Sequence, residues 1–162
     1  APRFRDFEKD GNLTLSERIG DDVADVADLV EQVEASGLLD KVGCDPVGIG
    51  AIYDAMIERE IPPEKIVAIS QGWKLGGAIK TAERKLAEGG MKHGGQAMMA
   101  WYVSNAKVEP RANSILITKQ ASGSAKIDPL MALFNAVTLI SLNPEGRGND
   151  DFMAAIRNPI IV

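Results

Sequence analysis

Residues 119–141, KQASGSAKIDPLMALFNAVTLIS, constrain the fold more than any other stretch. A loop of small and polar residues (121–125) leads to Asp128 and Pro129, and a run follows with Leu130, Met131, Leu133, Phe134, Val137 and Ile140. Proline suits the first turn of a helix, and aspartate is a preferred capping residue. A helix that is apolar nearly all round packs inside a protein. We therefore predict a buried helix here, with the Asp128 carboxylate at its N-terminus as a cap or a functional group.

Length and composition describe a soluble globular protein with a core. The chain has 162 residues, of which 45% are hydrophobic and 25% charged. No apolar run approaches the length of a membrane span, and no signal peptide opens the chain. The single cysteine, Cys44, excludes an intrachain disulfide and fits a reducing compartment. With only one histidine, a structural zinc site is also excluded.

Charge is distributed unevenly along the chain. Residues 1–60 carry 6 Lys and Arg against 15 Asp and Glu, whereas residues 61–162 carry 12 against 8. Ten of the basic residues lie between Lys65 and Lys126. Lysines on the outer faces of helices would explain this pattern, but a locally positive surface can also bind a phosphate backbone.

The order of apolar patterns predicts an α/β protein. A strand at 41–44, a helix at 47–59 and a strand at 65–70 form a βαβ pattern, which favours parallel strands with a right-handed crossover. Functional groups in such sheets lie at the carboxyl ends of strands, and Asp45 falls at one. The other predicted elements are a strand at 12–16, helices at 21–36, 75–88 and 96–105, a strand at 114–119, and the final helix.

Common catalytic motifs are absent from the sequence. It contains no GxxxxGK[ST] phosphate-binding loop and no GxSxG serine elbow, and nothing marks Cys44 as a reactive thiolate. Asp45 and Asp128 remain, each followed by proline and a helical run. Carboxylates suit hard divalent cations, although either acid alone is better explained as a cap than as a ligand. A phosphoacceptor role for Asp45 is weaker, because no acidic pair precedes it on a suitable strand.

Three segments in order carry a resemblance to a known family: VGCDPVGIGAIYDAM (42–56), HGGQAMMAWYVSNAKVEPR (93–111) and KIDPLMALFNAV (126–137). Together they resemble the nuclease domain of the large terminase subunit of tailed bacteriophages, from about Gly11 to the C-terminus. The resemblance implies an α/β, RNase H-like fold, here a partial domain with a small sheet flanked by helices. That domain would span residues 1–148, with a C-terminal tail at 149–162.

The resemblance also implies a metal-dependent endonuclease that cuts concatemeric viral DNA. Asp45 resembles the family's second metal-binding aspartate and Asp128 its last, in a site for two Mg²⁺ or Mn²⁺ ions. His93 and Asn105 match positions near the active face. We treat His93 either as a catalytic residue or as a loop histidine that caps the helix at Gln96. No residue of this chain matches the family's first aspartate, so we expect a piece of a longer polypeptide that binds metal weakly and cleaves little alone.

Partners follow from the same resemblance. They are double-stranded DNA, the terminase small subunit and the portal protein, with no membrane, in the cytoplasm of the bacterial host. The alternative is a non-catalytic DNA-docking or assembly module of the same packaging motor, which the unmatched first aspartate favours. The residues expected to bind the DNA backbone without reading its sequence are Lys74, Lys92, Lys107, Arg111, Lys119 and Lys126.

Overall fold

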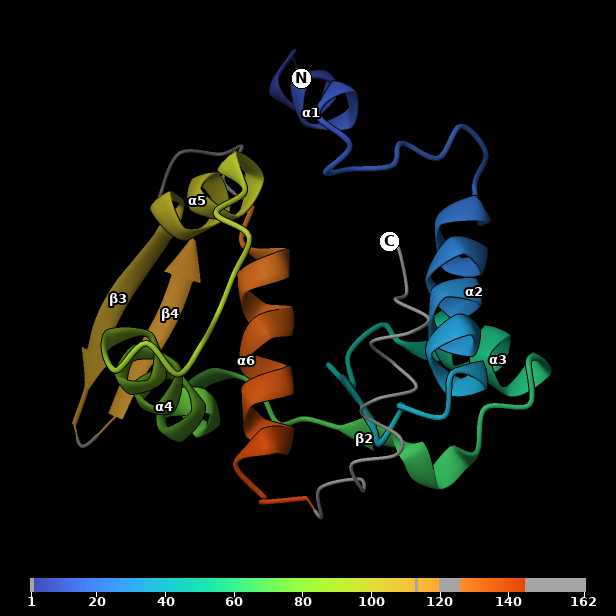
Figure 1. The fold of residues 1–162 in the computed structure, drawn as a ribbon. Helices are drawn as coiled ribbons and strands as arrows, with labels where there is room; N and C mark the ends of the chain where they lie inside the picture. The colour runs from blue at the N-terminus through green and yellow to red at the C-terminus, as the bar shows by residue number, and fades with distance from the viewer. Residues whose placement is uncertain (1, 113, 120–125, 145–162) are drawn as a thin grey trace. The chain divides into compact units, whose positions relative to one another are not determined.

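A computed structural model of the chain describes residues 2–112, 114–119 and 126–144. These residues form helices and two small sheets, so the α/β class is confirmed in its general form (Figure 1). The chain divides into two compact units. The hairpin unit consists of Ala1–Leu15 and Ser70–Ser141, and the parallel unit consists of Ser16–Ile69 and Leu142–Val162. Each unit is described by itself.

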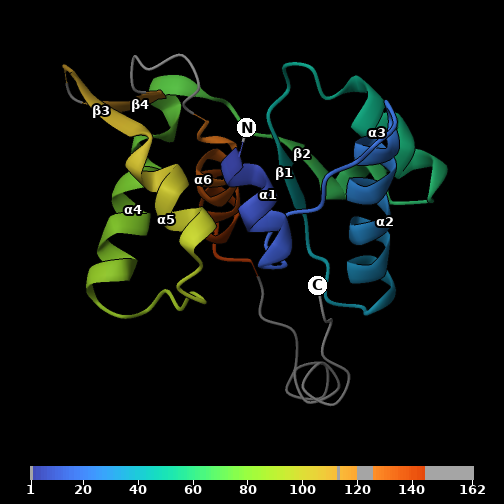
Figure 2. The same ribbon diagram turned by 90° about the horizontal axis from the view of Figure 1, so that it is seen from above.

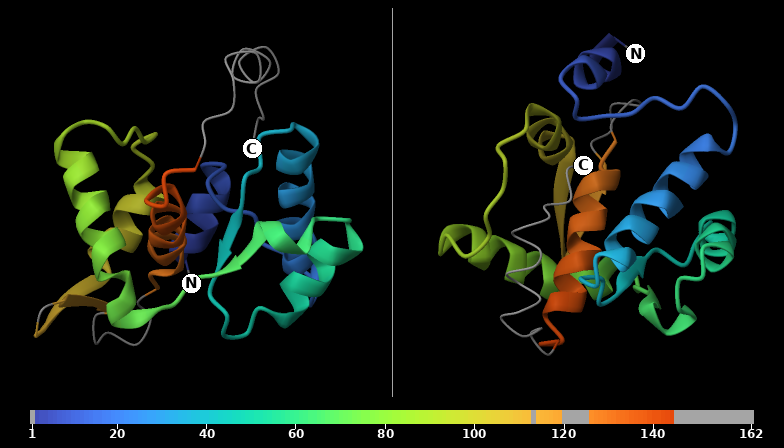
Figure 3. Two further views of the ribbon diagram at one scale, coloured as in Figure 1. Left: turned by 90° about the horizontal axis from the view of Figure 1, so that it is seen from below. Right: turned by 45° about the vertical axis from the view of Figure 1, so that its right-hand side comes forward.

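The parallel unit contains the predicted βαβ pattern. Strands β1 and β2 pair in parallel, with Val42 opposite Ile66 and Cys44 opposite Ala68. Helices α2 and α3 contact each other and lie on the same side of the strand pair (Figures 2 and 3). The elements are α2 (Asp21–Ala35), β1 (Val42–Cys44), α3 (Gly50–Glu58), the 3-10 turn η1 (Pro63–Lys65) and β2 (Ile66–Ala68).

Ala27 of α2, Met56 of α3 and Ile61 form the buried core of the parallel unit. On α2, Ala27 is fully buried, whereas its neighbour Val26 is 44% exposed. Two ion pairs tie neighbouring segments to α2 at its outer edge: Arg59 to Asp28 and Lys65 to Glu34, each 2.6 Å. All four side chains are partly or largely solvent-accessible, so the pairs stabilise the unit less than the apolar core does.

The hairpin unit packs helices beside an antiparallel pair of strands. Helices α4 and α5 both contact α6, and β4 contacts α4 and η2 (Figure 2). Strands β3 and β4 pair from Ala106 opposite Lys119 to Arg111 opposite Ser114. The elements are α1 (Pro2–Lys9), η2 (Gly72–Leu75), α4 (Gly76–Ala87), α5 (Ala97–Ser104), β3 (Ala106–Arg111), β4 (Ser114–Lys119) and α6 (Asp128–Ile140).

Helix α6 confirms the prediction made from the opening stretch, with two differences. Leu130, Phe134 and Val137 are buried, as expected from the apolar pattern, but Ile140 is 54% exposed. The buried set also includes a polar residue, Asn135, whose side-chain carbonyl accepts a hydrogen bond of 3.0 Å from Gln71 Nε2. A buried amide needs such a partner, because an unpaired polar group inside a protein costs free energy.

In the N-terminal part of the chain one prediction was wrong and one helix was not predicted. Residues 12–16 form no strand, and residues 2–9 form helix α1, whose Phe7 is buried and lies 5.7 Å from Trp101 between ring centroids. Strand β3 was also not predicted. None of the described helices is long and apolar enough to cross a membrane.

Candidate functional site

Asp45 lies directly after β1, at the carboxyl end of a parallel strand as predicted. Its Oδ1 accepts a hydrogen bond of 2.9 Å from the N–H of Val47, and Gly48 has a left-handed φ of 78°. This side-chain turn explains why α3 begins at Gly50 and not at Val47. Asp45 is exposed, and the described residues provide its Oδ2 with no hydrogen-bond partner.

Asp128 is the first residue of α6, and this position corrects the prediction that it caps the helix. The cap position belongs to Ile127, and no side-chain cap bond is formed. A capping carboxylate must precede the helix to reach the free N–H groups, whereas Asp128 already lies within the first turn. The helix dipole still favours a negative charge there. Among the described residues no group hydrogen-bonds the exposed Asp128 carboxylate.

Two residues of the α5 region surround the start of α6. Asn105 Nδ2 donates a hydrogen bond of 2.9 Å to the main-chain carbonyl of Lys126. The buried Tyr102 has a raised pKa, chiefly because burial disfavours its phenolate and secondly because the charge of Asp128 lies nearby. The resemblance had indicated Asn105, but Tyr102 was missed. Its spacing of three residues from Asn105 across the end of α5 could have indicated it.

His93 is exposed and belongs to a loop of the hairpin unit. Its Nδ1 accepts a hydrogen bond of 3.2 Å from the N–H of Gly95. The expectation that it caps the next helix was wrong, because the cap residue of α5 is Gln96 and has no side-chain cap bond. Its alternative role as a catalytic residue stays a prediction.

The two predicted metal-binding aspartates belong to different units, Asp45 to the parallel unit and Asp128 to the hairpin unit. Across the described ranges, no group of three or more His, Cys, Asp or Glu side chains is placed to hold a metal ion. The assignment of Asp45 and Asp128 as joint ligands stays a prediction.

All six residues expected to bind the DNA backbone are exposed and lie in the hairpin unit. This unit carries 12 Lys and Arg against 7 Asp and Glu, whereas the parallel unit carries 6 against 16. On the hairpin, Glu109 lies between two of these cations, 3.6 Å from Lys107 Nζ and 3.4 Å from Arg111. Thr118 on β4 donates a hydrogen bond of 3.2 Å to Glu109. The positive charge of the chain is thus concentrated on one unit.

Cys44 ends β1 and is half-buried. Burial raises the pKa of its thiol, so the side chain stays protonated at neutral pH. This agrees with the interpretation that Cys44 is a structural residue and not a nucleophile.

Exposed carboxylates after a parallel strand and at a helix start, together with a positively charged unit, are features of a domain that acts on nucleic acid. The chain belongs to the family described as terminase large subunit, endonuclease domain, which it matches over residues 7–143. This range contains all three segments that carried the resemblance. No curated protein and no solved structure matches the chain. Membership implies endonuclease activity, DNA as a partner and a role in phage DNA packaging.

Proposed function

We propose that the chain is the metal-dependent DNA endonuclease part of a phage or prophage packaging terminase, with an RNase H-like fold, and that it cuts concatemeric DNA. One observation carries the proposal: the family match over residues 7–143 includes both Asp45 and Asp128, and the structure leaves both carboxylates exposed. The terminase small subunit, the portal protein and the cytoplasm of a bacterial host belong to the same proposal.

The two aspartates suit a hard cation by their chemistry. Asp45 uses one oxygen in its turn, and Asp128 uses neither oxygen in a cap, so both can offer oxygen ligands. Mg²⁺ and Mn²⁺ prefer such ligands, and Mg²⁺ sites commonly combine one or two carboxylates with substrate phosphates. Asp45 and Asp128 would hold such an ion, and the chemistry supplied by it would be activation of water and stabilisation of the leaving 3′ oxygen.

Two residues of the α5 region lie beside Asp128 at the start of α6. Asn105 fixes the main chain at Lys126, two residues before the carboxylate. Tyr102 adds no second negative charge beside Asp128 at neutral pH, because an ordinary tyrosine is protonated there and burial raises the pKa of Tyr102 further. The cations of the hairpin unit would hold the DNA backbone by charge alone, which gives binding without sequence preference.

Cleavage of supercoiled plasmid by the complete large subunit tests this proposal. In Mn²⁺, Asp45→Asn and Asp128→Asn should each abolish nicking. The matched controls are Asp21→Asn and Asp22→Asn, which remove exposed acids from the first turn of α2 and should leave the rate unchanged. Nicking by both active-site variants at near wild-type rates would exclude the catalytic role.

The second candidate is a non-catalytic DNA-docking or assembly module of the same packaging motor. It is favoured by the finding that no cluster of three acidic or metal-ligating side chains exists in the described part of either unit. The same assay separates the two. A docking module would bind plasmid but leave it uncut at every Mn²⁺ concentration, in the wild type as well as in the variants.

A further inference from the structure

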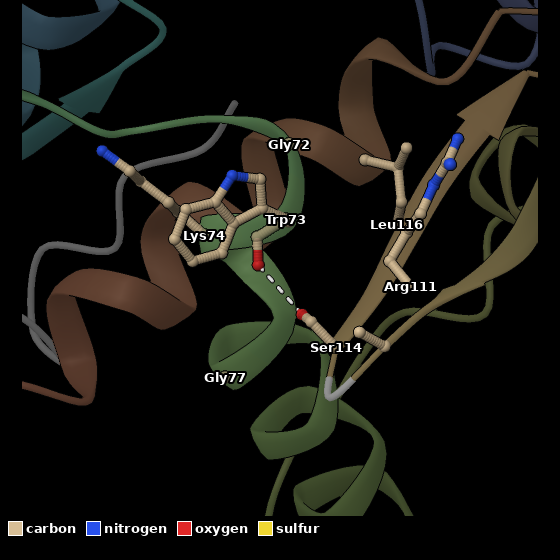
Figure 4. A pocket seen from close by; sticks show the side chains of 8 residues that line it. Gly72, Trp73, Lys74, Gly77, Arg111, Ser114 and Leu116 are labelled. Carbon is tan, nitrogen blue, oxygen red and sulfur yellow. Dashed lines mark hydrogen bonds between the residues drawn. The ribbon is translucent and has the colours of Figure 1, made fainter.

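An open depression lies on the hairpin unit, between the start of α4 and the β3–β4 hairpin (Figure 4). Its volume is about 900 Å³. Trp73 and Lys74 lie on one side of it, and Leu116 and Arg111 lie on the other. The lining residues are Gly72, Trp73, Lys74, Gly77, Arg111, Ala112, Ser114 and Leu116.

The side chain of Trp73 is exposed, while its main chain is fixed by contacts with neighbouring residues. The main-chain carbonyl of Trp73 accepts a hydrogen bond of 3.0 Å from Ser114 Oγ, and Gly72 before it has a left-handed φ of 70°. A Cβ at Gly76 would collide with Ser114 Oγ, so glycine permits this close approach of α4 to β4. The Trp73 residue is nevertheless 64% exposed. A large aromatic side chain that is positioned but not packed indicates a contact with a ligand.

The charges around the depression favour an anionic ligand. Lys74 Nζ lies 5.9 Å from the centroid of the Trp73 ring, and Arg111 ends β3 on the opposite side. None of the lining residues is acidic. Arg111 does pair with Glu109 at 3.4 Å, but its side chain is 63% exposed, so this pair is weak and leaves the guanidinium able to bind a phosphate.

We propose that this depression binds single-stranded DNA, with one base stacked on Trp73 and the flanking phosphates held by Lys74 and Arg111. The bases of a duplex stack on one another, so only an unpaired nucleotide can offer its face to the indole. Proteins that bind single strands combine aromatic platforms with cationic grooves in this way. The inference rests on the proposed function only in taking DNA as the substrate, and it requires neither metal nor cleavage.

The test compares two single-stranded 12-mers of the same length and charge, one of thymidine nucleotides and one of abasic nucleotides. Binding to the 162-residue protein is measured by fluorescence anisotropy in EDTA at several salt concentrations. Trp73→Ala should weaken binding of the thymidine strand by roughly 5- to 100-fold and leave binding of the abasic strand unchanged. Trp73→Phe should have a smaller effect on the thymidine strand, because phenylalanine can also stack.

Variants of the cations should behave differently. Arg111→Ala and Lys74→Ala should each weaken the binding of both strands. Each should also reduce the magnitude of the slope of log K against log salt concentration by about 0.7. The matched controls are Val108→Ala, an exposed apolar side chain outside the depression, and Lys80→Ala, an exposed cation of α4. These controls should leave the affinity for each of the two strands unchanged. Circular dichroism confirms that each variant is folded.

Two results would overturn the inference. If Trp73→Ala weakens both strands equally, the indole does not stack on a base. If it weakens neither, Trp73 does not contact the bound strand. Because the binding assay contains EDTA, its outcome is independent of the plasmid assay: base-dependent binding with no cleavage would refute the endonuclease proposal alone, and cleavage without base-dependent binding would refute this inference alone.

Discussion

The side-chain amide of Asn105 donates a hydrogen bond of 2.9 Å to the main-chain carbonyl of Lys126, 21 residues further along the chain. Asn105 follows α5, and Lys126 comes two residues before Asp128, the first residue of α6. The bond therefore joins the end of α5 to the segment just before α6. Asp128, the proposed metal ligand, is the first residue of α6. It gives Asn105 a positioning role that needs no contact with substrate.

Replacing Asn105 by alanine should affect both stability and cleavage. The loss of one hydrogen bond should lower the free energy of unfolding by about 1 kcal/mol, as measured by urea denaturation. The start of α6 should also be held less firmly, so plasmid cleavage by the complete subunit should slow while its affinity for DNA stays the same. Asn12→Ala, which removes only a local contact to Asp10, is the control. Unchanged cleavage would show that Asn105 does not position Asp128.

The ionisation of Tyr102 reports on the charge of Asp128. The chain has two tyrosines, so Tyr53→Phe leaves Tyr102 as the only phenol that absorbs on ionisation. Its pKa should lie above the ordinary value of about 10, and Asp128→Asn should lower it without restoring that value, because burial is the larger cause. Since the folded pKa exceeds the unfolded one, the contribution to stability is present below pH 10 and is lost as pH rises through the folded pKa. If the pKa of Tyr102 is the same in Asp128→Asn, the charge of Asp128 does not act on Tyr102.

Substitutions of Asp45 should separate its structural role from its chemical role. Asparagine retains an oxygen that can accept the hydrogen bond from Val47, whereas alanine does not. Asp45→Ala should therefore lower the free energy of unfolding by about 1 kcal/mol, and Asp45→Asn should lower it clearly less. Both should abolish cleavage. Equal stability losses for the two variants would mean that the turn does not depend on this hydrogen bond.

Glu109 restrains the two cations beside it on β3. Glu109→Gln removes one negative charge and keeps a side-chain oxygen that can accept from Thr118. Affinity for duplex DNA should rise about threefold at low salt, and the gain should shrink as salt screens the charges. Glu88→Gln is the control, because it frees Arg84 of α4 by the same change in charge but away from the hairpin. Equal gains for the two variants would assign the effect to net charge alone.

Much of the fold followed from local sequence pattern, and the exceptions have physical causes. The run 114–119 predicted β4 with its observed bounds, because its isoleucines and threonine are β-branched and favour a strand. Its partner β3 was missed because AKVEPR contains charges and a proline, and its residues are strand-forming mainly through pairing with β4. Helix α1 was missed because PRFRDFEK is polar, and its place depends on the contacts of Phe4 and Phe7 with Trp101.

The candidate site was predictable only in part. Asp45 was indicated by its place after a strand, and the structure confirms that place. Asp128 was indicated by the Asp-Pro start of an apolar helix, but its exact position in the first turn depends on the backbone geometry of Ile127. Gln71 and Asn135 could not be identified in advance, because their hydrogen bond joins segments far apart in the chain, whereas the helical spacing of Tyr102 from Asn105 could have indicated Tyr102.

The proposed function assigns both Asp45 and Asp128 as ligands of a bound metal ion. Paramagnetic broadening of amide NMR signals by Mn²⁺ tests it directly, and detects binding even when it is weak. We predict that the amide signals of residues 43–45 and 47 and of residues 127, 128, 130 and 131 broaden together at the same Mn²⁺ concentration, and that either Asp45→Asn or Asp128→Asn removes the broadening from both segments. Broadening of the two segments at different concentrations, or loss from only the mutated segment, would contradict it.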